Sequence, residues 1–138
     1  MSESSFWRSC KKELDRRKNA GDKIHYQRFE DSMTGGIPDL NICFGGVETW
    51  VELKAVEWPK RPTTPVRLGL RTDQSLWLNG RQRNGGRALV LAKVGRDVFI
   101  FNAYFKELVK GLPRATFEAV AYHKPKNIKD AVAFILQY

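Results

Sequence analysis

Two acidic residues and a lysine within residues 35–55 have the types and the spacing of a metal site. Two short apolar segments flank the Gly-Gly pair at 45–46, which supplies the positive φ angles of a two-residue hairpin turn. With the turn there, Asp39 lies opposite Glu52, and Lys54 shares their face because side chains alternate along a strand. Two carboxylates paired across a ladder repel each other by about 0.2–1 kcal/mol. A cation removes this cost, either Lys54 in an exposed salt bridge or a divalent ion such as Mg²⁺, which favours oxygen ligands.

The elements around this hairpin follow from periodicity and from turn residues. Apolar residues at helical spacing predict a helix over 4–18, and weak alternation predicts a strand over 24–29, followed by a loop at 32–36. Thr72 is the expected N-cap of a helix over 73–84, which the Gly-Gly pair at 85–86 ends. The apolar run 88–92 is typical of a central strand covered on both faces, and a second strand is expected at 98–101.

Beyond residue 101 the pattern predicts a strand between two helices. Asn102 is the expected cap of a short helix that ends at Gly111, residues 117–122 form an edge strand, and Asn127 opens a last helix. Strands and helices therefore alternate along the chain. The economical arrangement is a single α/β domain over 1–138, a central mixed β-sheet flanked by helices. Its core covers about 3–101, and a C-terminal extension covers about 102–138.

The charge of the chain favours a polyanionic partner. The 138 residues carry a formal net charge of +9, and between residues 58 and 96 Asp73 is the only acid against nine basic residues. Neutralising phosphates releases counterions, so such a bias favours nucleic acid over a merely basic, solvated surface. The candidate DNA-binding residues are Lys60, Arg61, Arg67, Arg71, Arg81 and Arg83.

The segment 57–71 contains three prolines and four basic residues, which exclude a regular element. We expect a functional loop that contacts phosphates or a partner subunit, with Trp58 exposed in it. No apolar run approaches the roughly 18 residues of a membrane span, and the chain does not begin like a signal peptide. An intracellular protein with no membrane partner is therefore expected. No phosphate-loop motif is present, so no nucleotide cofactor is expected.

Pro38-Asp39, twelve intervening residues and Glu52-Leu53-Lys54 match the PD-(D/E)xK nuclease signature. Gln74, near the start of a predicted helix and upstream of Gly-Gly and an apolar strand, resembles the VRR-NUC branch. The pattern is also similar to archaeal-type Holliday-junction resolvases, which phages often carry. The resemblance covers residues 3–101 and implies a restriction-endonuclease-like core. If the chain is phage-encoded, its location is the host cytoplasm.

The resemblance implies a Mg²⁺-dependent endodeoxyribonuclease, with Mn²⁺ as a substitute. Asp39, Glu52 and the Leu53 backbone carbonyl are the expected metal ligands. Lys54 would orient the attacking water and help to deprotonate it, and Gln74 would hydrogen-bond near Lys54 or that water.

The family also has an acid in its first helix. Glu3, near the middle of the apolar stripe of this helix, is the first candidate, and Glu13, towards its edge, is the alternative. Glu3 would otherwise be an ordinary first-turn acid that the helix dipole favours.

The sequence is compatible with more than one kind of DNA substrate. A Holliday-junction resolvase would act as a homodimer, because two symmetric strands of a four-way junction must be cut together. A VRR-NUC-type flap or repair nuclease is the alternative. An alternative of another class is a non-catalytic nucleic-acid-binding protein on a nuclease-like scaffold.

Overall fold

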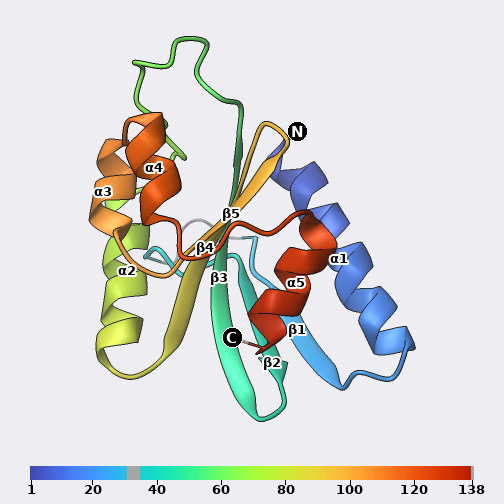
Figure 1. Ribbon diagram of the computed structural model, residues 1–138. Coiled ribbons are helices and arrows are strands. Elements are labelled where there is room, and N and C mark those ends of the chain that lie inside the picture. The colour runs from blue at the N-terminus through green and yellow to red at the C-terminus, as the bar shows by residue number, and fades with distance from the viewer. Residues whose placement is uncertain (31–34, 138) are drawn as a thin grey trace.

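A five-stranded mixed sheet lies between two layers of helices in the computed structural model, which describes residues 1–30 and 35–137 (Figure 1). The strand order is β1-β2-β3-β4-β5; β3 and β4 are parallel, and the other neighbours are antiparallel. The elements are α1 Glu3–Asn19, β1 Ile24–Arg28, β2 Leu40–Phe44, β3 Val47–Val56, α2 Thr72–Arg83, β4 Arg87–Val94, β5 Asp97–Phe101, α3 Phe105–Lys110, α4 Arg114–Val120 and α5 Ile128–Gln137. The predicted fold class, a single α/β domain with helices flanking a mixed sheet, is confirmed.

The β2–β3 hairpin turns at the two predicted glycines. Gly45 and Gly46 have φ angles of 62° and 79°, which L-residues with side chains rarely adopt. Leu40 pairs with Val51 and Phe44 with Val47, so the predicted register is confirmed over the length of β2.

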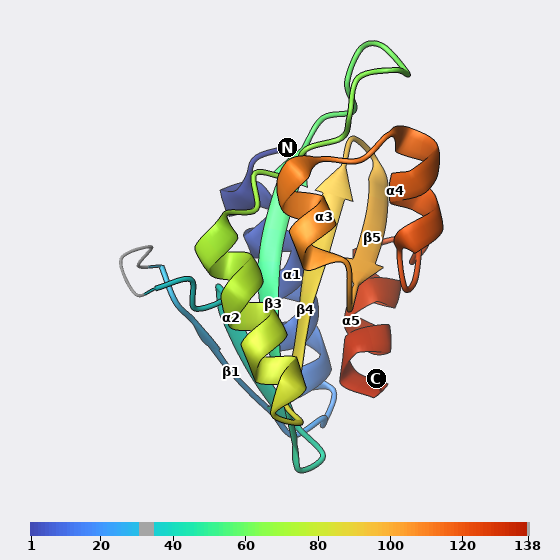
Figure 2. The same ribbon diagram turned by 90° about the vertical axis from the view of Figure 1, so that its left-hand side faces the viewer.

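The two faces of β3 pack against two different apolar clusters, and the polar site lies on one of these faces. Val51 and Leu53 lie in a buried cluster with residues of α1 and α5, whereas Trp50 packs against a second cluster with residues of α2, α3 and α4. Figure 2 shows α2 and α3 in front of the sheet and α1 behind it. Because side chains alternate, Glu52 and Lys54 lie on the α2 face.

Residues 117–122 do not form the predicted edge strand; α4 occupies 114–120 instead. Phe117 is fully buried, with ring centroids 5.1 Å from Phe99 and 4.9 Å from Phe101. This seven-residue helix buries the one ring and leaves its neighbours Thr116 and Glu118 exposed. Tertiary packing therefore overrides the β-propensity of the segment.

Two predicted caps are also wrong. Arg71, not Thr72, is the N-cap of α2, because Thr72 already belongs to the helix. Asn102 does not cap α3, which begins at Phe105 after Tyr104 in a left-handed conformation with φ 61°. The loop predicted at 32–36 lies outside the described residues except for Gly35 and Gly36, which form a turn.

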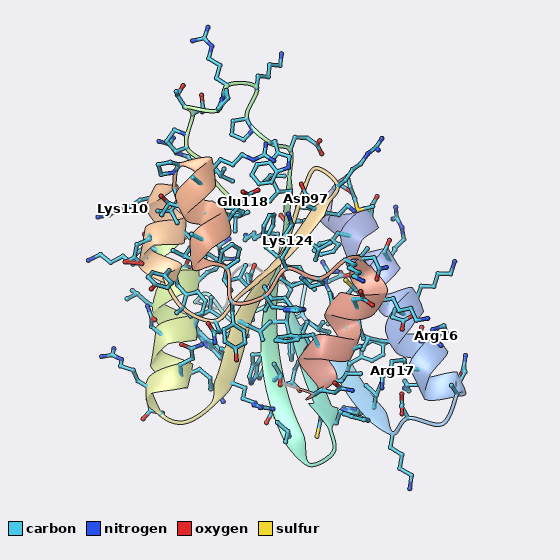
Figure 3. All side chains as sticks on the ribbon, in the orientation of Figure 1. Arg16, Arg17, Asp97, Lys110, Glu118 and Lys124 are labelled. Carbon is cyan, nitrogen blue, oxygen red and sulfur yellow. The ribbon has the colours of Figure 1, made fainter. Side chains whose placement is uncertain are left out.

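The segment 57–71 rises above the sheet as a long irregular loop (Figure 1), but its ends are anchored. Trp58 is half-buried rather than exposed: its indole N–H donates to Asp97 at 3.0 Å, and its ring contacts Phe99 at 5.8 Å. Asp97 is labelled in Figure 3. Val66, Leu68 and Leu70 are buried in the core. The apolar side chains at both ends thus hold the loop to the core, and the half-buried Trp58 corrects the expectation that it is exposed. Among the described residues, no helix combines the length and apolarity needed to cross a membrane.

Candidate metal centre

Three carboxylates from separate parts of the chain meet at one end of the hairpin. Glu3 comes from the first turn of α1, Asp39 immediately precedes β2, and Glu52 lies in the middle of β3. One oxygen of each lies within 4.8 Å of the others. Carboxylate oxygens are hard ligands, so this set fits Mg²⁺ or Mn²⁺ rather than a thiol-preferring metal.

Asp39 is held in place by the backbone of two neighbouring strands. Its Oδ2 accepts a hydrogen bond from the Leu53 N–H at 2.8 Å, and its carbonyl accepts one from the Phe29 N–H at 2.7 Å. In an extended strand, the N–H and C=O of one residue point to the same edge. The Leu53 carbonyl therefore faces the edge of β3 on which Asp39 lies.

Glu52 is buried, with 1% of its surface exposed. Its Oε2 lies 3.4 Å from Lys54 Nζ and accepts a hydrogen bond from Gln74 Nε2 at 3.1 Å. Its Oε1 is also buried, and among the residues that the structure describes it has no hydrogen-bond partner. Burial, and then the neighbouring Asp39 carboxylate, raise the pKa of Glu52 to about 8. A buried carboxylate with an unsatisfied oxygen beside a second carboxylate is a place where a divalent cation would be stabilised.

The first turn of α2 determines how Gln74 meets Glu52. The Gln74 side-chain carbonyl accepts the Arg71 N–H at 2.9 Å, in the way a capping residue does. The amide nitrogen must then face Glu52, because the two ends of the amide cannot exchange without losing both bonds. The resemblance implied a hydrogen bond of Gln74 near Lys54 or the attacking water; in the structure Gln74 donates to the Glu52 oxygen that lies 3.4 Å from Lys54 Nζ.

Gly36 allows α2 to approach the site this closely. Its φ angle is +85°, and a Cβ atom at this position would overlap the backbone carbonyl of Asp73 and lie 2.8 Å from the Gln74 nitrogen. Gly35 has a similar φ of +66°, but a Cβ atom there would meet none of the described residues within 4 Å. Gly36 is therefore the glycine that packing requires.

Lys54 places its ammonium group in the centre from the same strand as Glu52. The residue is 6% exposed, so the long stem is packed and only the head reaches the polar hollow. Glu52 and Lys54 are two residues apart, so their side chains project from the same face. One strand therefore supplies both an anion and a cation to a single site.

A small polar hollow of about 160 Å³ contains these groups. Its lining includes two residues that sequence reasoning missed, Phe29 and Glu30, and the backbone of the turn before β2. The antiparallel pairing of β1 with β2 could have indicated these two residues. Residues that follow β1 lie beside residues that precede β2, and Asp39 immediately precedes β2. Glu30 therefore adds an acid to the rim of the hollow.

Glu13 does not belong to this cluster. Both of its oxygens accept hydrogen bonds from Arg16 at 2.7 Å, which lower the pKa of the Glu13 carboxyl. Arg16 lies towards the C-terminal end of α1, on the side away from the sheet (Figure 3). Of the two candidate acids in the first helix, the structure thus brings Glu3 to the hairpin acids.

The candidate DNA-binding residues are spread over three regions. Lys60 and Arg61 are exposed in the projecting loop, while Arg67 lies across Gly111. Arg71 lines the hollow and pairs with Asp73 at 3.0 Å. The remaining two, Arg81 and Arg83, lie in the last turns of α2. The six basic residues therefore do not form one patch, and Arg71 is the one among them that lines the hollow.

No protein-family model and no curated protein matches the chain. Among solved structures, the chain is similar to Archaeoglobus fulgidus Hjc, a Holliday junction resolvase from an archaeal hyperthermophile, determined at 1.6 Å resolution. The match has a TM-score of 0.43 and 20% sequence identity, and it covers 68% of this chain and 72% of that chain. Similarity at this level carries no argument about activity. The acidic cluster and its neighbours have to support any function by themselves.

Proposed function

We propose that this protein is a divalent-metal-dependent endonuclease that hydrolyses phosphodiester bonds in DNA. The observation that carries the proposal is the buried Glu52, which has one unpartnered oxygen among the described residues, meets Lys54 with the other, and lies in one acidic cluster with Asp39 and Glu3. Paired acids that only formed a surface salt bridge would be exposed and satisfied. The formal net charge of +9 supports a nucleic acid as the substrate.

Asp39, Glu52 and the Leu53 carbonyl would hold Mg²⁺ or Mn²⁺, and Glu3 would complete the ligand set. When bound, such an ion supplies a more acidic water and stabilises charge on the phosphate oxygens. Lys54 would orient the attacking water and help to remove its proton, and its charge would offset negative charge that develops in the transition state. Gln74 would keep the Glu52 carboxylate in a fixed direction through its 3.1 Å hydrogen bond.

A four-way junction cut by a homodimer is the finer form of this proposal, because symmetric cleavage of two strands suits a two-fold assembly. A flap or repair nuclease is the alternative. The projecting loop with exposed Lys60 and Arg61 supports either one, since a basic loop that rises above the sheet can follow a branch of the DNA (Figure 1).

A panel of end-labelled substrates tests the proposal: a four-way junction, a flap, a splayed arm and a linear duplex, each with Mg²⁺, Mn²⁺ or EDTA. We expect cleavage that requires the metal, and symmetric paired nicks in the junction if the protein is a resolvase. Asp39→Asn should abolish cleavage yet retain DNA binding, because it removes a metal ligand and one negative charge near the phosphate. Glu48→Gln, which changes an exposed acid of the same hairpin, is the matched control.

A wild-type protein that binds DNA but cleaves none of these substrates with either metal would refute the nuclease proposal and favour the non-catalytic alternative. An Asp39→Asn protein that still cleaves would remove Asp39 from the centre.

A further inference from the structure

A row of aromatic rings leads away from the metal centre across the α2 face of the sheet. Phe29, which lines the metal hollow, stacks on Trp50 with ring centroids 5.5 Å apart and planes 29° from parallel. Trp50 in turn meets Trp77 of α2 edge-on at 5.2 Å. All three rings are half-buried. The row therefore connects the centre to the outer part of α2, and none of the proposed catalytic roles uses it.

A guanidinium group ends the row. The Arg81 guanidinium carbon lies 4.6 Å from the centroid of Trp77 and 5.6 Å from that of Trp50. The stem of Arg81 crosses Gly86, where a Cβ atom would lie only 2.7 Å from Arg81 Cγ. Arg81 is thus held in one direction by a ring on one side and a bare backbone on the other, which reduces the entropy it loses on binding a ligand.

An open hollow of about 600 Å³ lies on α2 beside Trp77 and Arg81. Leu76, which is 66% exposed, and Gly80 also line it. Glycine inside a helix is destabilising relative to alanine, yet a Cβ atom on Gly80 would meet nothing within 4 Å in the described part of the chain. The fold does not require this glycine. Its effect is to leave bare backbone where another molecule can approach closely.

We infer that Trp77, Arg81 and the hollow beside them bind unpaired nucleotides of the DNA strand that enters the metal centre. Aromatic faces and guanidinium planes stack on bases of any sequence, and a base exposes its face only when it is unpaired. Charge complementarity supports the same occupant, since residues 76–87 contain three arginines and no acid. The inference rests on the proposed function for its substrate, and it narrows that substrate to DNA with a single-stranded segment beside the cut.

The distances suit such a strand. A stacked strand advances about 3.4 Å per nucleotide, so the two ring spacings of 5.5 and 5.2 Å, placed end to end, correspond to at most about three nucleotides between Phe29 and Trp77. A flap, a splayed arm or an opened branch point can supply this length of unpaired DNA, whereas an intact linear duplex cannot.

Binding in EDTA tests the site separately from catalysis. Fluorescence anisotropy would compare a labelled 15-nucleotide oligo(dT) with a 15-base-pair duplex on wild type and on Trp77→Ala. Loss of a stacked base corresponds to about 5- to 150-fold weaker binding, so we expect this loss for oligo(dT) and a change within about two-fold for the duplex. Because binding is measured without metal, a protein that fails to cleave the substrate panel with Mg²⁺ or Mn²⁺ would refute the nuclease proposal without bearing on this result.

Two further variants keep the test decisive. Gly80→Gln fills the hollow from a position with open space, so it should raise the melting temperature and still weaken oligo(dT) binding. Trp7→Ala is the matched control, because Trp7 also lies under a guanidinium, that of Arg28 at 4.9 Å, but belongs to the opposite face of the sheet.

Three results would overturn the inference: unchanged oligo(dT) affinity in a folded Trp77→Ala or Gly80→Gln protein, an equal loss for the duplex, or an equal loss in Trp7→Ala. A change of oligomeric state in Gly80→Gln, seen by sedimentation, would assign the hollow to a second copy of the chain instead.

Discussion

The raised pKa of Glu52 makes the stability of the metal-free protein depend on pH in an unusual direction. In the unfolded chain this carboxyl group loses its proton near pH 4.5, whereas in the folded protein it keeps the proton to about pH 8. Between these values the unfolded state binds fewer protons, so the free energy of unfolding falls as the pH rises. Carboxylates held by basic partners, such as Glu13, behave in the opposite way, with a pKa that is lowered.

The size of the effect follows from the same two values. One proton difference corresponds to a slope of about 1.4 kcal/mol per pH unit, so Glu52 removes about 3 kcal/mol of stability by pH 7. Glu52→Gln has no proton to lose. We therefore expect its free energy of unfolding to fall less steeply than that of wild type between pH 5 and pH 8, with the slopes differing by about 1.4 kcal/mol per pH unit.

Urea unfolding followed by circular dichroism in EDTA at pH 5, 6, 7 and 8 measures both slopes. Glu48→Gln, an exposed acid of the same strand, should parallel wild type. Saturating Mg²⁺ at pH 8 should restore stability to wild type, by about 2.7 kcal/mol at one hundred times the dissociation constant, and have little effect on Glu52→Gln. Parallel profiles for wild type and Glu52→Gln would refute the reasoning, because Glu52 would then be ionised without a metal.

Two other perturbations probe the scaffold and the loop. Gly36→Ala should disrupt the contact between the turn and α2, and so lower both the melting temperature and the affinity for Mg²⁺. Gly35→Ala should have a smaller effect, because it adds only backbone strain of about 1–3 kcal/mol. Equal effects of the two substitutions would contradict the role given to Gly36. Replacing Lys60 and Arg61 together by alanine should weaken DNA binding and reduce the slope of log affinity against log salt by the equivalent of about two phosphate contacts. Fluorescence anisotropy between about 50 and 200 mM salt measures this slope, and an unchanged slope would show that the loop does not contact phosphates.

The hairpin was predictable because local rules determine it. A pair of glycines and strict alternation are sufficient to define the turn and the register, and the register brings Asp39 towards Glu52. The apolar run that became β4 was likewise recognisable, since every residue from Ala88 to Ala92 is buried. Both features depend on neighbours in sequence.

Other features depend on contacts between distant segments. The helical pattern placed Glu3 and Glu13 on comparable sides of α1, and only the docking of this helix on the sheet separates them. Trp58 is half-buried because Phe99 and Phe117, some 40 and 60 residues later, supply rings against it. Phe117 is helical for the same reason. A single sequence contains no local sign of these partners.

The two-glycine turn also restricts how the hairpin can change length. A one-residue insertion shifts one strand by one position, which would set Asp39 opposite an apolar neighbour of Glu52, either Val51 or Leu53. A shift of two positions returns Asp39 to the same face of the hairpin as Glu52. It also displaces the two carboxylates by about 6.6 Å relative to each other along the strand, which is farther than the 4.8 Å within which the oxygens of the acidic cluster now lie. Substitutions can change the chemistry of this hairpin, but a change in its length would separate the residues of the site.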